Sequence, residues 1–140
     1  MPDLGIPVEE FNTHFKLTTS AGLNTFKIDE PIRLYIDVIG EEFVSFNLDE
    51  YNQDRELALF ILQDQQWVPV ENLTQYPEGY LVYGPAEGDP LKRGVLSVFP
   101  ILDNKDQEAL IRVVVTGKIF KDEQITDEKV VGYVDVQLKP

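Results

Sequence analysis

A strict alternation of apolar and polar residues is the feature that most constrains the fold of this chain. In the segment "IRLYIDVIG" (32–40), every second residue is aliphatic: Ile32, Leu34, Ile36 and Val38. Successive side chains of a β-strand point to opposite faces of its sheet. The pattern therefore predicts a strand with one face in a hydrophobic core and the other toward solvent.

Similar segments recur along the chain. "FVSFNL" (43–48) repeats the alternation, and "LALFIL" (57–62) is apolar on both faces, which predicts a central strand covered on each side. The polar stretch "QDQQ" (63–66) predicts a hairpin into "WVPV". In this returning strand Pro69 lacks an amide hydrogen, which favours a position at a sheet edge.

Helical periodicity is nearly absent, and proline and glycine turns separate the short apolar runs. We therefore predict an all-β fold, a two-sheet antiparallel sandwich of about 8–10 strands. A chain of 140 residues holds about one domain. We assign residues 13–140 to this domain and residues 1–12, with the segment "PDLGIP", to an N-terminal tether.

The last third of the chain carries a resemblance to a known fold family. A polar corner (103–108) leads into the long segment "ALIRVVVTGKIF" (109–120), and an acidic loop (121–129) joins it to "VVGYVDVQLKP" (130–140). This order resembles the end of an immunoglobulin-like or fibronectin type III-like domain. The cysteine pair of antibody domains is missing, and Leu110 stands where their corner has a tyrosine. The resemblance implies a fold and no function, because such sandwiches serve many roles.

The charge of the chain narrows the classes of partner. Asp and Glu number 25 against 12 Lys and Arg, and the net charge is −13. Such a surface repels phosphate backbones and anionic lipids, so we expect no nucleic-acid binding. No segment approaches the ~20 apolar residues of a membrane helix, so we expect no membrane insertion.

The start of the chain lacks the basic and apolar regions of a signal peptide, and there is no cysteine. A cytoplasmic location fits these features, but so do bacterial periplasmic or cell-surface modules. We favour the latter compartments.

Catalytic motifs are not evident. His14 is the only histidine, and the sequence has no G-x-S-x-G elbow, no phosphate-binding glycine loop and no H-E-x-x-H segment. His14 is expected to be a surface or packing residue. We therefore expect no enzymatic activity.

Acidic turns raise the possibility of calcium, which binds six to eight oxygen ligands. In an immunoglobulin-like topology the turn "GEE" (40–42) lies at the same end as the loop 121–129, whereas the corner 103–108 lies at the opposite end. Six carboxylates could then converge, and they are Glu41, Glu42, Asp122, Glu123, Asp127 and Glu128. The alternative is that they are solvated turn residues.

Aromatic residues suggest a second candidate site. Exposed rings beside amides suit carbohydrate, because the apolar face of a sugar stacks on a ring while amides bind its hydroxyls. The alternative is that the rings pack as ordinary strand residues. The candidate residues are Trp67, Tyr76, Tyr80 and Tyr83, with Gln65, Gln66 and Asn72 beside them.

These features lead to two functional hypotheses. The first is a noncatalytic adhesion, scaffold or assembly module of a bacterial protein, acting through protein–protein contacts, with no cofactor. The alternative is a carbohydrate- or calcium-binding β-sandwich module. In the first case an edge strand such as the one with Pro69 can accept a partner strand, and the acidic surface favours a basic partner.

Overall fold

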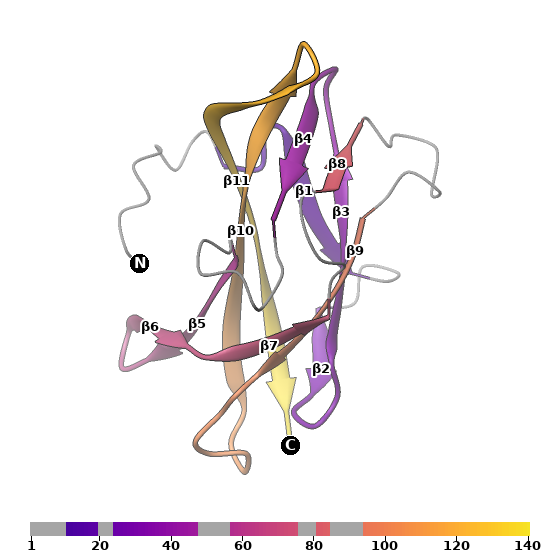
Figure 1. Cartoon of the computed structure of the whole chain (residues 1–140). Coiled ribbons are helices and arrows are strands. Elements are labelled where there is room, and N and C mark those ends of the chain that lie inside the picture. The colour runs from indigo at the N-terminus through magenta and orange to yellow at the C-terminus, as the bar shows by residue number, and fades with distance from the viewer. Residues whose placement is uncertain (1–10, 20–23, 48–56, 76–80, 85–93) are drawn as a thin grey trace.

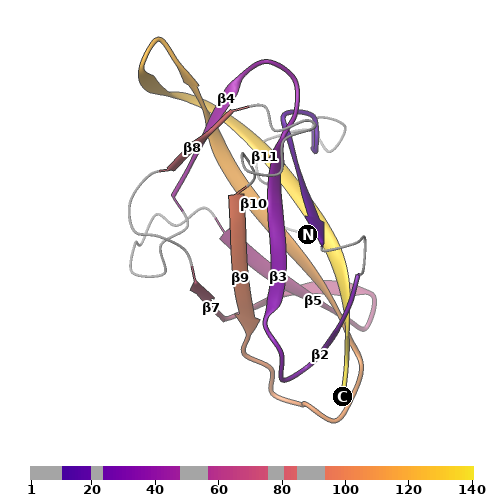
Figure 2. The ribbon, with the colours of Figure 1, turned by 90° about the vertical axis from the view of Figure 1, so that its right-hand side faces the viewer.

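The fold is all-β, as a computed structural model shows for residues 11–19, 24–47, 57–75, 81–84 and 94–140. Two sheets pack face to face (Figures 1 and 2), which confirms the predicted sandwich. Eleven strands follow one another along this described part of the chain: β1 (Phe15–Thr19), β2 (Thr25–Lys27), β3 (Ile32–Val38), β4 (Phe43–Phe46), β5 (Leu57–Gln63), β6 (Gln66–Val70), β7 (Asn72–Gln75), β8 (Leu81–Tyr83), β9 (Gly94–Pro100), β10 (Ala109–Lys121) and β11 (Gln124–Lys139).

The smaller sheet has four strands in the order β1-β3-β9-β7. The larger sheet has seven and is built around β10. One edge of β10 pairs with β11, and the other edge is shared by β5, opposite 111–115, and β4, opposite 118–120. β6 extends the sheet beyond β5, and β8 extends it beyond β4. The pairing is antiparallel as predicted except between β2 and β11, which run parallel.

The main core lies between the two sheets. The aliphatic side chains of β3 that the alternation assigns to the inner face are all buried, and Ile36 is fully enclosed. Phe15 on β1 and Phe46 on β4 meet edge to face with ring centroids 4.9 Å apart. Burial of these side chains supplies most of the driving force for folding.

A second, smaller apolar cluster covers the outer face of the larger sheet. Phe60 of β5, Val114 of β10 and Val131 of β11 are buried there beneath Phe11. Phe60 faces this cluster, whereas Leu59 faces the main core. The prediction of a strand covered on both sides is therefore confirmed for 57–60, whereas Leu62 at the end of the predicted segment is exposed.

Residues 11 and 12, which we assigned to the tether, pack against the domain. The Phe11 ring meets the Tyr133 ring at 6.0 Å. The Asn12 backbone N–H donates to the Val131 carbonyl oxygen, and the Tyr133 N–H donates to Asn12 Oδ1. These contacts attach residues 11 and 12 to β11 at Val131 and Tyr133. The domain therefore includes Phe11 and Asn12. Residues 1–10 lie outside the described residues, and the tether itself stays a prediction.

Two tight hairpins join β5 to β6 and β10 to β11. Asp64 and Gln65 form the first turn, and Asp122 and Glu123 form the second, all with positive φ. Two such residues in a row are typical of a type I′ turn, whose twist matches that of the flanking strands. The predicted hairpin at 63–66 is confirmed. The loop we expected at 121–129 is instead a two-residue turn followed by strand.

Candidate binding cleft

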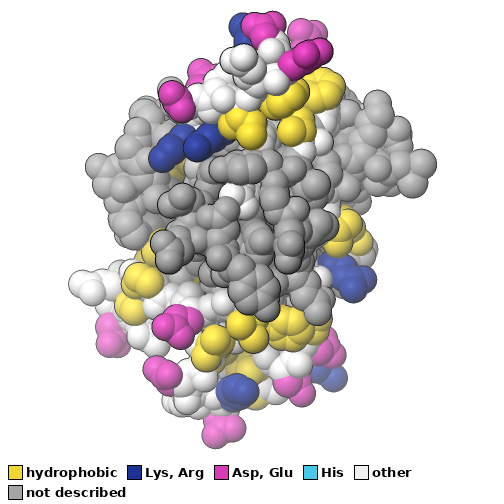
Figure 3. All heavy atoms as spheres, viewed as in Figure 1, with side chains coloured by type: hydrophobic (Ala, Val, Ile, Leu, Met, Phe, Trp, Pro, Cys, Tyr) yellow, Lys and Arg dark blue, Asp and Glu magenta, His cyan; other side chains and the backbone are white. Residues whose placement is uncertain are grey.

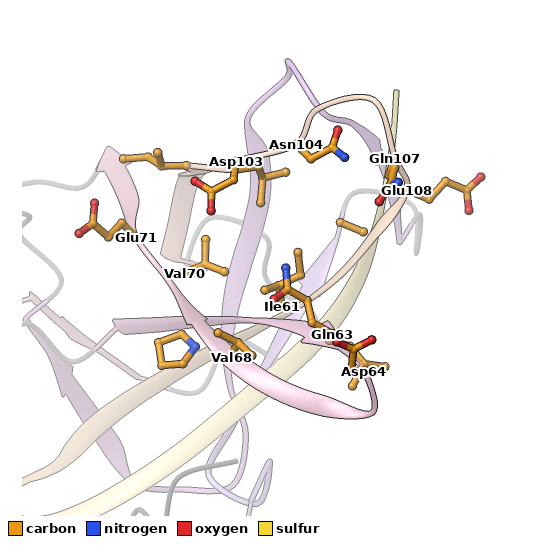
Figure 4. Close-up of a pocket in the computed structure, with 15 residues that line it drawn as sticks. Ile61, Gln63, Asp64, Val68, Val70, Glu71, Asp103, Asn104, Gln107 and Glu108 are labelled. Carbon is orange, nitrogen blue, oxygen red and sulfur yellow. The ribbon is translucent and has the colours of Figure 1, made fainter.

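An open cleft of about 720 Å³ lies at the end of the sandwich opposite the β10–β11 turn. One wall is the β5–β6 hairpin, and the other is the connection between β9 and β10 (101–108). Figure 4 shows this connection arching over the hairpin, with Asp103 pointing down between them and Glu108 pointing away. Asp103 is therefore the carboxylate best placed to meet a bound group.

A backbone contact fixes the spacing of the two walls. After Val70 the chain leaves the larger sheet and enters β7 of the smaller sheet, turning at Glu71. The Ile101 N–H donates to the Glu71 carbonyl oxygen at 2.8 Å. Farther along, the Asp106 N–H donates to Asn104 Oδ1, which closes a local turn in the same connection. Hydrogen bonds of the backbone therefore fix both the corner where the two walls meet and the turn within the 101–108 connection.

The floor of the cleft is apolar. Ile61, Val70 and Leu102 are partly buried and pack against the main core, while Val68 and Ile101 are exposed. This floor is the place where the core reaches solvent between the two sheets. An apolar side chain entering the cleft would bury further surface, at about 25 cal/mol per Å² removed from water.

The rim of the cleft is acidic. Its charged lining residues are Asp64, Glu71, Asp103 and Glu108, with no Lys or Arg among the described lining. Figure 4 shows these carboxylates spread around the opening rather than gathered at one point. Amide side chains of Gln63, Asn104 and Gln107 stand between them. The cleft therefore combines an apolar floor with a negative border.

Arg112 lies on the outer face of the larger sheet and links the β5–β6 hairpin to β11. Its guanidinium carbon lies 4.3 Å from the centroid of the Trp67 ring on β6 and 4.7 Å from that of Tyr133 on β11. It also donates two hydrogen bonds to Asp135, from Nε at 2.8 Å and from Nη2 at 3.0 Å. This hydrogen bonding raises the pKa of Arg112 above its usual value. The guanidinium is therefore charged at neutral pH.

The candidate carbohydrate residues do not form one surface among the residues that the structure describes. Trp67 packs in the outer cluster with Arg112 over its ring, as the packing alternative expected. Gln65 lies in the exposed turn of the hairpin beside Gln66, and Asn72 belongs to the other sheet. Tyr83 pairs with Val44 through its backbone. Tyr76 and Tyr80 lie outside the described residues.

The candidate calcium ligands do come to one end of the molecule. β4 pairs with β10 from Phe43 opposite Phe120, so the turn with Glu41 and Glu42 adjoins the β10–β11 hairpin (Figure 1). Asp127 and Glu128 lie in a bulge of β11, where Thr126 Oγ1 donates to the Ile119 carbonyl oxygen at 2.8 Å.

These carboxylates nevertheless do not gather as a metal site. Among the described residues, no three His, Cys, Asp or Glu side chains group in a way that could hold a metal ion. Glu42 lies instead 3.5 Å from Nε2 of His14, which also contacts Thr13. Both Asp122 and Glu123 are exposed in the turn.

The sequence analysis missed the cleft because its two walls are about forty residues apart. Asp103 and Glu108 were recognised only as a polar corner, and Glu71 carried no motif. A signal was present in the composition, because each wall places carboxylates and amides beside aliphatic residues.

Comparison with known proteins does not identify a relative. No family model, no curated protein and no solved structure matches the chain. In the described part of the chain, no helix is long and apolar enough to cross a membrane.

Proposed function

We propose that this protein is a noncatalytic binding module that holds a protein partner in the cleft between the β5–β6 hairpin and the 101–108 connection. The observation that carries the proposal is the pairing of an apolar floor with four acidic lining residues; Lys105 of the same connection is exposed but is not among the described lining residues. The partner supplies an exposed segment that carries both aliphatic and basic side chains.

The chemistry of the cleft favours such a segment. Aliphatic side chains fit a floor of Ile61, Val70 and Leu102, and lysine or arginine side chains reach the carboxylates of Glu71 and Asp103. The spread of the carboxylates suits several separated positive charges. The net charge of −13 adds long-range attraction, which raises the rate of association with a basic partner.

A partner that inserts side chains into the cleft fits this hairpin better than a partner that adds a strand to the free edge of β6. Among the strands that the structure describes, β6 pairs with β5 alone and so lies at an edge of the sheet. In a two-residue hairpin the pair beside the turn is hydrogen-bonded and the pairs then alternate, so the backbone of Pro69, opposite Phe60, faces the free edge. Because proline has no N–H, this edge lacks a donor that an added strand would need.

The finer assignment belongs to the same proposal. An immunoglobulin-like or fibronectin type III-like module of a bacterial periplasmic or surface protein, serving adhesion or assembly, agrees with a two-sheet architecture and an acidic surface. Such folds host many unrelated functions, a docking role among them, so this part of the proposal depends on the cleft and not on the fold.

A peptide titration tests the proposal. The probe is a six-residue peptide of alternating lysine and leucine, and the readout is the backbone amide NMR spectrum of the protein. We expect the largest shift changes at Ile61, Val68 and Asp103. A peptide of alternating glutamate and leucine should leave the spectrum unchanged.

Two matched variants locate the binding. Glu71→Gln with Asp103→Asn removes two exposed rim charges, and we expect affinity to fall about 2- to 30-fold, since each exposed pair contributes about 0.2–1 kcal/mol. Asp122→Asn with Glu123→Gln removes two exposed charges from the opposite end and should leave affinity unchanged. An equal loss in both variants, or shifts scattered over the surface, would mean that only general electrostatic attraction is at work.

A further inference from the structure

A row of apolar side chains crosses the projecting end of the larger sheet. Phe43 on β4 lies opposite Phe120 on β10, which in turn lies opposite Ile125 on β11. Directly paired residues share a face of the sheet. Phe43 is 48 % exposed and Ile125 is 40 % exposed, while Phe120 between them is partly buried. Figure 3 shows hydrophobic side chains gathered at this end of the molecule.

The row faces away from the main core. Val44 and Ile119 are buried in the core, so their chain neighbours Phe43 and Phe120 point to the opposite face of the sheet. The Phe43 ring lies over Gly84, where an added Cβ would come within 2.9 Å of it. The absence of a side chain at Gly84 thus leaves room for the end of the Phe43 ring close to the backbone.

Charges of opposite sign flank the row along the strand direction. Lys118, two residues before Phe120, pairs with Lys129 of β11 and shares the outer face with the row. Asp122 and Glu123 form the turn two and three residues after Phe120. Lys121 adjoins Asp122, and Asp127 and Glu128 precede Lys129, so neither border carries charges of one sign alone. On the outer face, however, strand alternation places 118, 120 and 122 together, with a lysine on one side of the apolar row and an aspartate on the other. Figure 3 shows both kinds of charge around the hydrophobic patch.

We propose that this row, with its two charged borders, is the contact through which a second copy of the chain associates. A two-fold axis that lies between two facing copies, parallel to their sheets and perpendicular to the strands at the level of Phe120, turns the two outer faces toward each other. It also reverses the strand direction, so position 118 of one copy faces position 122 of the other. Each lies about 7 Å from the axis, at roughly 3.3 Å per residue. Every lysine border then meets an acidic border, and Phe43, Phe120 and Ile125 pack against the same residues of the partner. A surface of this kind is complementary to itself.

The association is weak. Stable dimers bury about 1,200–2,000 Å² in total, more than a row of three side chains supplies. The net charge of −13 on each copy also opposes contact. We expect a dissociation constant on the order of 10 µM to 1 mM.

Sedimentation velocity over protein concentrations from about 10 µM to about 1 mM tests the proposal. The wild-type protein should shift from monomer to dimer across this range. Ile125→Ser should remain monomeric without any change of charge. A wild-type protein that stays monomeric at the highest concentration would overturn the proposal.

Paired charge reversals make the test specific. Lys118→Glu with Lys129→Glu should abolish association, and so should Asp122→Lys with Glu123→Lys. The second variant changes the net charge from −13 to −9, because two acids become two bases, and it would associate more strongly if overall repulsion were decisive. An equimolar mixture of the two variants should restore the dimer. If the mixture remains monomeric, the proposed pairing is wrong.

Two controls separate this surface from other effects. Lys16→Glu with Lys27→Glu adds the same negative charge at exposed positions of β1 and β2 and should still dimerise. The cleft variant Glu71→Gln with Asp103→Asn should also dimerise. Failure of self-association therefore leaves the proposed function of the cleft untouched, and failure of peptide binding leaves the dimer untouched.

Discussion

Replacing Arg112 with lysine tests whether one side chain ties the hairpin beside the cleft to the two longest strands. The guanidinium forms two hydrogen bonds with Asp135 of β11 and stacks between Trp67 of β6 and Tyr133 of β11. Lysine keeps the positive charge but cannot make two parallel hydrogen bonds or stack as a plane. The substitution therefore removes the geometry and retains the charge.

The expected loss follows from these contacts. Hydrogen bonds that involve charged groups contribute about 1.5–3 kcal/mol, and a cation over an exposed aromatic ring contributes about 0.5–1 kcal/mol. The side chains of Arg112 and Asp135 are 21 % and 35 % exposed, so water screens part of the attraction. Because lysine retains some of it, Arg112→Lys should lower the free energy of unfolding by about 1–2.5 kcal/mol.

Urea unfolding measures this loss with two probes. Trp67 is the only tryptophan, so its fluorescence reports on the hairpin beside the cleft, while far-ultraviolet circular dichroism reports on both sheets. Asp135→Asn and the double variant complete a mutant cycle, which should give a coupling of about 1 kcal/mol. Arg33→Lys, at an exposed position on β3, is the matched control. A loss below about 0.5 kcal/mol, or one equal to that of Arg33→Lys, would refute the reasoning.

Two further substitutions test the packing between the sheets. Ile36→Asp places an unpaired charge at a fully enclosed position and should abolish cooperative folding. Arg33→Asp, on the other face of β3, should still fold. A soluble Ile36→Asp protein that melts cooperatively would mean that the inner face is misassigned. Gly117→Ala would bring a Cβ within 2.5 Å of Val44 Cγ1 and 2.8 Å of Phe46 Cε1. We expect overpacking to cost about 1–3 kcal/mol in thermal unfolding, and an unchanged melting temperature would count against it.

Local patterns in the sequence were sufficient to predict several of the strands, among them β3 and β5. The alternation at 32–38 follows from the two faces of a single strand, and no distant residue is needed to interpret it. The burial of 57–60 on both sides could also be predicted, because apolar residues on both faces require a cover on both sides. What covers the outer face, including Phe11, could not be predicted, since it depends on chain segments far apart in sequence.

The β10–β11 hairpin was predicted, but its structure shows why the connecting turn was expected to be longer than it is. Its turn is Asp122–Glu123, both at positive φ and without the glycine or asparagine that usually marks such turns. The strand then continues through Ile125 and Thr126 among polar residues, because this end projects beyond the sandwich and has no core to cover (Figure 1). A strand segment that is rich in acidic residues and covers no core has the same composition as a solvated loop, so the sequence alone does not distinguish the two.

The cleft was harder to predict than the strands or the hairpin, because it exists only in the tertiary structure. Its walls meet only because the chain changes sheets at Glu71 and Ile101 bonds to that corner. Nothing in the local pattern of either wall specifies this approach. The acids of 103–108 could therefore be found from the sequence, but not their neighbours.

The two proposed surfaces lie at opposite ends of β10, and this separation determines what a dimer could do. The cleft adjoins Ala109, whereas the association row crosses Phe120. A two-fold axis at Phe120 directs the two domains away from each other, and at about 3.3 Å per residue the clefts lie roughly 70 Å apart. A short basic segment cannot reach both, so it gains no avidity from the dimer. A dimer of this geometry instead joins two separate partner molecules, or two distant sites of one large partner, which is the behaviour of an assembly module.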